Sequence, residues 1–330
     1  MKAAAYIAGL LGLALLTGLV LHADVPAIVQ AWKMAGFSLL WLIPYRLIYF
    51  ALYAVGWRAM LRPFDTQGRA GYGYVLWVSI VREAVDRLLP VASVGGTVVG
   101  IRLIRWRGLA TSAVSATIIG EIVLTVIAVY LFASLATLLL VGSGAGGSHR
   151  TVIVVLAFSL PIPVVSFLLL RYGSIFQRLQ RFASPLVGLT GADTAASLDA
   201  DVRACLGRVR TLALAGALEL VALISASFEI WWALRLFDHP VSAASSVMLE
   251  GLTQGVRHLA FIVPAGLGVQ EAAMVLFGHA LGLGADTALA VSAVKRLREV
   301  LCGVPPLLSW HWLETRRLRT LGGHARASRS

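Results

Sequence analysis

Charged side chains recur inside apolar segments of this chain, and two groups of them could do chemistry. One group lies within residues 82–87 and the other within residues 295–299. Residues four apart on a helix lie one above the other, so opposite charges at that spacing are expected to pair. The predicted pairs are Arg82–Asp86, Glu83–Arg87 and Lys295–Glu299. Arginines beyond these pairs could hold an anionic group, because guanidinium ions form strong charge-assisted hydrogen bonds.

Ionisable groups at membrane depth cost about 2.5–3.5 kcal/mol each on insertion scales and are best interpreted as functional. The alternative is that they pair only to lock helices together, and for Arg46, Glu219 and Glu229 both interpretations stay open. For the two groups above, a functional role is favoured. The last helix cannot place all its cations on one side, so at least one should face a hydrated cavity or an anionic ligand.

Several of these charges are candidate site residues. The candidate substrate-binding residues are Arg82, Arg87, Arg257, Lys295, Arg296 and Arg298. The candidate charge partners or proton-coupling groups are Glu83, Asp86, Glu121, Glu271 and Glu299. His258 and Glu271 do not predict a metal site, because no second histidine lies near them in the sequence. No nucleotide-binding loop or Ser/His/Asp arrangement is present, so no cofactor is expected.

The composition is that of a membrane protein. Of the residues, 58% are hydrophobic and 13% are charged, whereas a soluble domain has about 25% charged residues. Several apolar runs reach the ~20 residues that cross a hydrocarbon core, so the predicted fold class is all-α and polytopic. The net charge of +12 does not indicate nucleic-acid binding, because most of the arginine excess lies in loops and the C-terminal tail. Cys205 and Cys302 form neither a disulfide framework nor a metal motif.

Two apolar segments are interrupted in the same way, by a proline ahead of a glycine pair. The two sets are Pro90, Gly95 and Gly96, and Pro264, Gly266 and Gly268. Proline removes a backbone donor and glycine permits conformations closed to other residues, so each set predicts a helix break. Within a bilayer such backbone survives only where protein or water covers it. Paired breaks in corresponding halves therefore point to a transport site.

The apolar runs and the loop charges predict one transmembrane domain over residues 1–312. About six spanning helices are expected, at 3–22, 36–57, 109–141, 151–170, 212–234 and 287–310. A cytoplasmic loop at 171–210 and a basic cytoplasmic tail at 313–330 complete the arrangement, with both termini in the cytoplasm.

Two further segments are predicted to be re-entrant helical hairpins. Residues 72–101 lie between two basic loops, so this segment should enter and return on the cytoplasmic side. Residues 241–283 have flanks with little positive charge, so this segment should enter from outside. The sequence Ala-Val-Ser-Ala occurs at both 113–116 and 290–293, which supports two inverted halves at about 72–130 and 241–310.

These motifs resemble the flippase-like transmembrane domain of lysylphosphatidylglycerol synthetases and their stand-alone relatives. The likeness rests on the first break followed by Arg102 and the Glu121 helix, and on the second break followed by Glu271 and the cationic last helix. It covers residues from about 40 to 312. Among stand-alone members, the chain looks most like the branch associated with hopanoid biosynthesis.

The resemblance implies a protein of the bacterial inner membrane that moves a lipid between leaflets. It maps the family's hairpin residues onto the two breaks and Glu271, and its last-helix arginine onto Arg296 or Arg298. Family members carry an acidic residue just after the first glycine pair, where this chain has Thr97, which puts an acidic role at this point in doubt. No aminoacyl-transfer domain follows residue 312, so we expect no lipid lysylation.

The leading hypothesis is a lipid translocase, not an enzyme, that acts on a lipid with an anionic or isoprenoid-derived headgroup or on a hopanoid. Without a nucleotide motif, its transport would be downhill or coupled to an ion gradient. The alternative is a membrane-embedded lipid-modifying enzyme, or an accessory subunit that presents lipid to a biosynthetic enzyme. The expected partners are a membrane lipid and a lipid-biosynthesis enzyme, and no nucleic acid. A purely structural scaffold is disfavoured by the density of buried charge.

Overall fold

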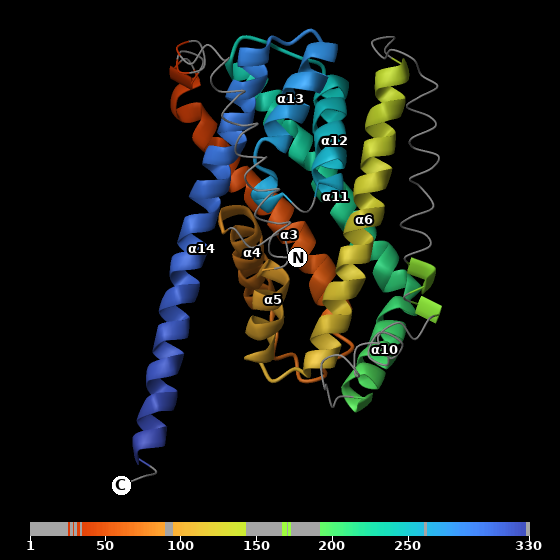
Figure 1. The fold of residues 1–330 in the computed structure, drawn as a ribbon, viewed down its shortest axis with the longest axis vertical. Helices are drawn as coiled ribbons and strands as arrows, with labels where there is room; N and C mark the ends of the chain where they lie inside the picture. The colour runs from red at the N-terminus through yellow and green to blue at the C-terminus, as the bar shows by residue number, and fades with distance from the viewer. Residues whose placement is uncertain are drawn as a thin grey trace.

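The described part of the chain consists of helices and short connections, without a strand (Figure 1). The structure is a computed structural model that describes residues 26, 29, 32–33, 35–89, 95–142, 167–169, 171–172, 192–260 and 263–327. Within these residues, three helical segments are long and apolar enough to cross a membrane. They are Gly36–Leu61, Thr111–Gly142 and Val209–Leu236. The prediction of an all-α polytopic membrane protein is confirmed.

The helices follow one another with short connections, and most begin close to where the apolar pattern predicts. In chain order they are η1 (Gly36–Trp41), α3 (Leu42–Leu61), α4 (Tyr72–Leu88), α5 (Gly95–Arg105), α6 (Thr111–Gly142), α10 (Ala192–Leu206), α11 (Val209–Leu236), α12 (Ala243–Leu259), η2 (Pro264–Gly266), α13 (Val269–Ala280) and α14 (Ala285–Ala327). The predicted segments 3–22 and 151–166 lie outside the described residues.

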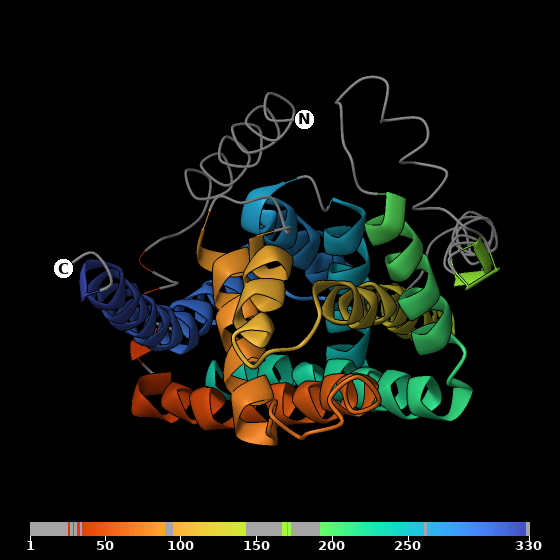
Figure 2. The ribbon, with the colours of Figure 1, turned by 90° about the horizontal axis from the view of Figure 1, so that it is seen from below.

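Helices α3 and α11 pack against each other along one face of the molecule (Figure 2). Tyr45 donates a hydrogen bond to the carbonyl oxygen of Ser225 at 2.8 Å. Further along α3, Gly56 lies so close to Ala215 that a Cβ on the glycine would stand 3.2 Å from the Ala215 Cα. Residue numbers therefore rise along α3 as they fall along α11, and the two helices run antiparallel.

Helices α4 and α5 form an antiparallel hairpin. Near its base the Tyr74 hydroxyl donates to the carbonyl oxygen of Leu103 at 2.6 Å, and near its tip the Gly96 N–H donates to Asp86 Oδ1 at 2.8 Å. The second arm approaches closely, because a Cβ on Gly96 would lie 2.5 Å from the backbone oxygen of Arg82. Asp86 thus accepts from one of the N-terminal amides of α5, which have no partner within their own helix.

Helices α12 and α13 form a second hairpin, whose tip contains η2. Three residues of this tip have left-handed backbone, with φ of 55° at Ala265, 61° at Gly266 and 74° at Gly268. Glycine adopts this conformation freely, whereas for any other residue it costs roughly 1–2 kcal/mol of conformational free energy. The chain thus leaves the helix where the sequence carries its second proline–glycine set, starting at Pro264.

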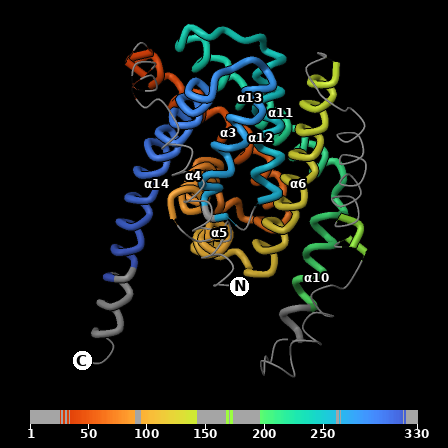
Figure 3. The backbone as a smooth tube through the Cα atoms, turned by 45° about the horizontal axis from the view of Figure 1, so that its top comes forward, coloured from red at the N-terminus to blue at the C-terminus, as the bar shows by residue number. Residues whose placement is uncertain are grey.

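The long helices α6 and α14 flank the two hairpins on opposite sides (Figures 1 and 3). Each packs against the first arm of the hairpin from the other half of the chain. Trp77 on α4 donates its indole N–H to Ser309 Oγ on α14 at 2.9 Å. On the other side, a Cβ on Gly251 of α12 would lie 2.6 Å from the Cβ of Ala136 on α6. The two halves are therefore interlocked.

The packing partners repeat when α3–α6 are exchanged for α11–α14. Helix α3 packs on α4 as α11 packs on α12, and α4 packs on α14 as α12 packs on α6. Because α3 and α11 are antiparallel, equivalent helices run in opposite directions. Figure 1 shows the hairpin α4–α5 and the hairpin α12–α13 coming from opposite ends, and η2 at the tip of the second packs against α4. The repeat includes α3 and α11, which the predicted halves 72–130 and 241–310 left out.

Two stretches that the sequence analysis assigned to a loop and a tail contain helix. Helix α10 lies within the polar stretch 171–210, and its Val202 and Leu206 are buried in the same core as Trp57 of α3. Helix α14 continues to Ala327, through most of the predicted tail. The four-residue spacing of the two apolar residues in α10 gives one buried face, which is enough to hold a polar helix on the bundle.

The close approach of α5 to α4 gives a test of the first hairpin. We expect Gly96→Ala to lower the stability of the purified protein by about 1–3 kcal/mol, because the new methyl group would meet backbone that cannot move aside. Thermal unfolding in detergent measures the effect. Gly73→Ala on α4 is the matched control, since no atom lies within 4 Å of a Cβ there. Equal stability of the two variants would contradict the packing of this hairpin.

Candidate functional site

Charged side chains from six helices meet where the tip of the second hairpin packs against α4. This central cluster consists of Arg46, Glu83, Arg87, Glu229, Arg257, Glu271, Arg296, Arg298 and Glu299. It holds five arginines and four glutamates, so it carries one surplus positive charge when all are ionised.

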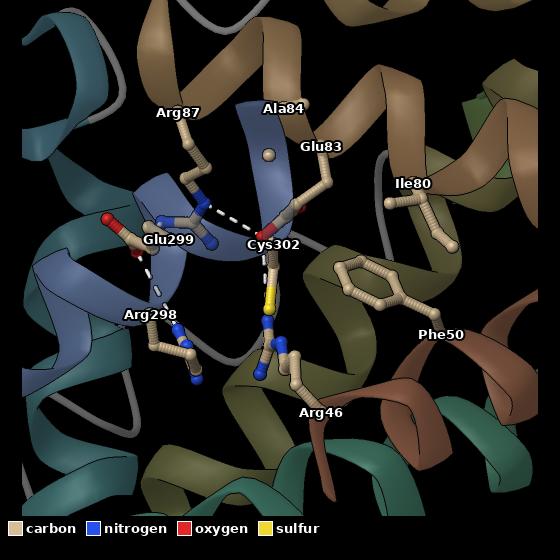
Figure 4. A pocket seen from close by; sticks show the side chains of 10 residues that line it. Arg46, Phe50, Ile80, Glu83, Ala84, Arg87, Arg298, Glu299 and Cys302 are labelled. Atoms are coloured by element: carbon tan, nitrogen blue, oxygen red, sulfur yellow. Dashed lines mark hydrogen bonds and ion pairs between the residues drawn. The ribbon is translucent and has the colours of Figure 1, made fainter. Parts of the chain in front are cut away.

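Six members of the central cluster form a closed ring in which positive and negative charges alternate. Around this charge ring the order is Arg46, Glu83, Arg87, Glu299, Arg298 and Glu229. The ring joins α3, α4, α11 and α14, so it connects the first hairpin with the long helix of the other half. Figure 4 shows five of its members around a small cavity.

Most links of the charge ring are long. The nitrogen–oxygen distances are 3.6 Å for Arg87–Glu299, 3.5 Å for Arg46–Glu83, 3.6 Å for Arg46–Glu229 and 3.9 Å for Arg298–Glu299. Charge-assisted hydrogen bonds measure about 2.7–2.9 Å, so these groups attract each other without being fully hydrogen-bonded. Arg87 Nη1 and Glu229 Oε1 are buried and make no hydrogen bond to any described residue. The ring therefore keeps unused hydrogen-bonding capacity.

Glu299 is the hub of the central cluster. Its carboxylate lies within ion-pair distance of four guanidinium groups, at 3.1 Å from Arg296, 3.6 Å from Arg87, 3.8 Å from Arg257 and 3.9 Å from Arg298. One carboxylate cannot satisfy the donors of four arginines, since each guanidinium carries five N–H groups. The surroundings of Glu299 are thus suited to a second anion.

The tip of the second hairpin is attached to α14 through Arg296. This side chain donates to Glu271 Oε1 at 2.8 Å and to the backbone oxygens of Ala265 and Gly266 at 2.9 and 3.1 Å. The left-handed backbone at the tip turns both carbonyls toward the guanidinium. A Cβ on Gly266 would come 3.0 Å from Arg257 Nε, so the glycine also makes room for a second arginine of the cluster.

Two further ion pairs stand apart from the charge ring. Arg82 on α4 donates two hydrogen bonds of 2.8 Å to Glu121 on α6, and its guanidinium lies 4.5 Å from the centre of the Trp57 ring. Lys295 on α14 donates to Glu250 on α12 at 2.5 Å. Each pair joins a hairpin to a long helix of the same half, with the signs exchanged between the halves. Removing one partner of a buried ion pair costs about 3–5 kcal/mol of stability. Both pairs therefore fix their helices together, and we call them the locks.

Two of the three pairs predicted from helical spacing are wrong. The wrong pairs are Arg82–Asp86 and Lys295–Glu299, whereas Glu83–Arg87 is confirmed at 2.8 Å. Spacing reports only neighbours on the same helix, and such a pair contributes only about 0.2–0.5 kcal/mol. Arg82 and Lys295 instead pair with glutamates on facing helices, where the contacts are short and buried.

A larger cavity lies beside the charge ring, between α3, α4, α6, α11 and α12. It encloses about 720 Å³ free of atoms, its open mouth included. Arg46, Phe50, Glu83 and Arg87 line both this large cavity and the small one, so they form the wall between them. Its lining brings polar side chains from all five helices together, and such convergence of polar groups is typical of a small-molecule site.

Four of the six predicted substrate-binding residues lie around Glu299, and the other two form the locks. Arg87, Arg257, Arg296 and Arg298 surround the glutamate, while Arg82 and Lys295 do not contact it. Each cation of α14 in this region has a carboxylate partner. Arg298 nevertheless lines the small cavity, as expected for a cation of this helix that faces open space.

Sequence reasoning undervalued Arg46 and Glu229, which close the charge ring, and it missed the aromatic residues beside them. The Arg46 guanidinium lies 3.8 Å from the centre of the Tyr49 ring, a distance typical of a cation–π contact. The three-residue spacing of Arg46 and Tyr49 on α3 was a usable signal, because it places both on one helix face. Tyr53 extends this face along the large cavity.

Thr97 stands where family members carry an acidic residue, and in the structure Asp86 places a carboxylate close to this position. Thr97 is partly exposed in the first turn of α5, one residue after the Gly96 amide that donates to Asp86. The Asp86 carboxylate thus stands at the N-terminus of α5, where negative charge is favoured by the helix dipole. An acidic group is present at this point of the fold, although it comes from the other arm of the hairpin.

The central cluster combines a positive surplus, guanidinium donors that are only partly used and an adjoining cavity. These are the properties that suit a site to an anion such as a phosphate group. Within the described part of the chain, no group of three or more histidine, cysteine, aspartate or glutamate side chains could hold a metal ion.

Comparison with known proteins places the chain in a family. The family model described as the lysylphosphatidylglycerol synthase TM region matches residues 6–304. Comparisons with curated proteins and with solved structures gave no match.

Proposed function

Because the chain belongs to the family of lysylphosphatidylglycerol synthase transmembrane regions, we propose that it moves a lipid with an anionic, phosphate-bearing headgroup between the leaflets of the bacterial inner membrane. The observation that carries the proposal is the Glu299 carboxylate among four guanidinium groups where the tip of the second hairpin packs against α4. A hopanoid without a charged headgroup would leave this surplus of arginine without a role.

The anionic headgroup would bind by taking over guanidinium donors that Glu299 and the charge ring use only partly. Arginine binds phosphate through two parallel hydrogen bonds, and the ring links of 3.5–3.9 Å leave donors available for them. The headgroup would enter through the large cavity and reach the charge ring at Arg46 and Arg87, which line its wall. Its acyl chains would extend into lipid. Glu299 would hold the arginines together when no lipid is bound.

The inverted arrangement of the two halves supports transport. Many transporters place the substrate site near the bilayer midplane, between inverted repeats whose helices are broken there. In this chain the end of α4 and the tip of the second hairpin pack against each other near mid-length of the molecule (Figure 1). As re-entrant hairpins from opposite sides, α4–α5 and α12–α13 would alternately open the cluster to each leaflet.

The distribution of exposed arginines indicates how the chain is oriented in the membrane. One end of the molecule, where α3 and α14 end and α4 and α6 begin, carries most of them (Figure 1). They are Arg58, Arg62, Arg69, Arg102, Arg105, Arg107, Arg203, Arg208, Arg210, Arg316, Arg317 and Arg319. By the positive-inside rule this end faces the cytoplasm, together with the C-terminus. A first span at 3–22 would bring the N-terminus to the same side.

Lipid movement tests the function directly. We expect the protein in liposomes to move labelled phosphatidylglycerol faster than labelled phosphatidylcholine or a labelled hopanoid. Arg298→Ala and Glu271→Ala should each slow this movement about tenfold or more, which corresponds to about 1.4 kcal/mol of lost binding. The loss follows because one variant opens the charge ring and the other releases Arg296.

The matched control for these variants is Arg102→Ala, whose side chain is 57% exposed and pairs with Glu314 away from the cluster. It should leave lipid movement unchanged. Equal movement of all lipids by the native protein and both cluster variants would rule out the proposed site. Chemical conversion of the lipid, seen by mass spectrometry of the recovered lipids, would favour an enzyme instead.

Cysteine labelling tests the orientation of the hairpins. In a background with Cys205→Ala and Cys302→Ala, we expect Gly284→Cys to react with a membrane-impermeant reagent from outside and Arg105→Cys only from the cytoplasmic side. Both positions are exposed at helix ends. Labelling of both from one side would refute the entry of the hairpins from opposite faces.

A further inference from the structure

Glu219 is a buried carboxyl group on α11 that faces the large cavity. Its one hydrogen-bond partner among the described residues is the Thr125 hydroxyl on α6, which donates to Glu219 Oε1. No arginine, lysine or histidine nitrogen of the described residues lies within 4.0 Å of its oxygens. A buried carboxylate without a cationic partner is strongly disfavoured, so this group needs another way to lose its charge.

The other glutamates at this depth are each paired with a cation. They are Glu83, Glu121, Glu229, Glu250, Glu271 and Glu299. Asp86 instead accepts a backbone N–H, from Gly96. Of the acidic side chains on the wall of the large cavity, Asp86 and Glu219 thus have no cation within 4.0 Å among the described residues, and Glu219 differs from Asp86 in that its partner is a hydroxyl and not a backbone N–H.

The charged and titratable groups facing Glu219 come from four helices. They are Tyr49, Tyr53 and Arg46 on α3, Arg82, Glu83, Asp86 and Arg87 on α4, Glu121 on α6, and His258 on α12. Arg82 acts on Glu219 through space, but both of its terminal nitrogens donate to Glu121 at 2.8 Å. Arg46 and Arg87 are engaged in the charge ring.

Glu121 and Glu219 thus lie under the influence of one arginine, which donates hydrogen bonds to Glu121 and not to Glu219. A bidentate guanidinium favours the charged form of its carboxylate partner, whereas the hydroxyl partner of Glu219 leaves a negative charge uncompensated. Of the two, Glu219 is therefore the group whose contacts favour the neutral form. It lines a cavity with an open mouth, through which a proton can be exchanged.

We propose that Glu219 is the proton-binding group of the large cavity, so that binding of an anionic headgroup is linked to a bound proton. The inference rests on the proposed function and adds a coupling ion to it. A deprotonated Glu219 would place a negative charge on the wall that receives the headgroup and would repel it. Since linkage is reciprocal, a bound anion also favours proton binding, and lipid and proton would move together.

The test is anion binding by the native protein in detergent as a function of pH. The probe is dihexanoylphosphatidylglycerol, whose phosphodiester stays singly charged, between about pH 5 and pH 9, a range in which buried carboxyl groups titrate. Affinity should fall by at least about fivefold as pH rises, a typical coupling between two sites. Glu219→Gln, which is permanently neutral, should keep high affinity throughout, and Glu219→Asp should retain the fall.

A second readout needs no lipid. Infrared spectra of the native protein at neutral pH should show the carbonyl stretch of a protonated carboxylic acid, and Glu219→Gln should lack it. Glu314→Gln is the matched control and should retain the band, because Glu314 pairs with Arg102 away from the large cavity.

The outcomes separate the coupling from the transport function. Affinity for the probe that is selective but independent of pH, or a carboxylic acid band that persists in Glu219→Gln, would overturn the proton site and leave the translocase standing. A strict requirement for sodium ions in the binding assay would also overturn it. Absence of selective phosphatidylglycerol binding at every pH would instead contradict the proposed function.

Discussion

The structure depends on the attraction between one carboxylate, Glu299, and the four guanidinium groups around it. Burying these charges away from water is expensive, so the fold must bring every partner to one place. The unusual backbone of the second hairpin serves this end. The left-handed tip of the second hairpin offers two carbonyls to Arg296, and Gly266 leaves room for Arg257.

The same charges divide into tight and loose contacts, and that division suggests which contacts can change partners. The Arg82–Glu121 and Lys295–Glu250 locks have contacts of 2.8 and 2.5 Å and join helices of the same half. The charge ring connects the two halves through Arg87–Glu299 and Arg46–Glu229, each at 3.6 Å. These two loose links can be exchanged for other partners more easily than the locks can. An anion at the ring would compete for the same donors.

The fold class and the irregular backbone of the second break could be predicted from the sequence, because each left a local signal. Pro264 with its glycines marks irregular backbone, and charges inside apolar runs such as Arg298 are visible without a structure. The partners of Arg82 and Lys295 could not be predicted in this way. They depend on which helices face each other, and no local pattern places Glu250 opposite Lys295 across 45 residues. Glu219 was ambiguous for the same reason, since its lack of a cation is a property of its neighbours.

The central claim is that Glu299 occupies the place of an anion that the arginines would otherwise bind. The most direct measurement is the affinity of the purified protein for dihexanoylphosphatidylglycerol before and after Glu299→Gln. With the competing carboxylate neutralised, the four arginines should bind the lipid about tenfold more tightly or better, a gain of about 1.4 kcal/mol. The same substitution should leave affinity for dihexanoylphosphatidylcholine unchanged. Weaker or unchanged binding of the anionic lipid by a folded Glu299→Gln variant would contradict the account.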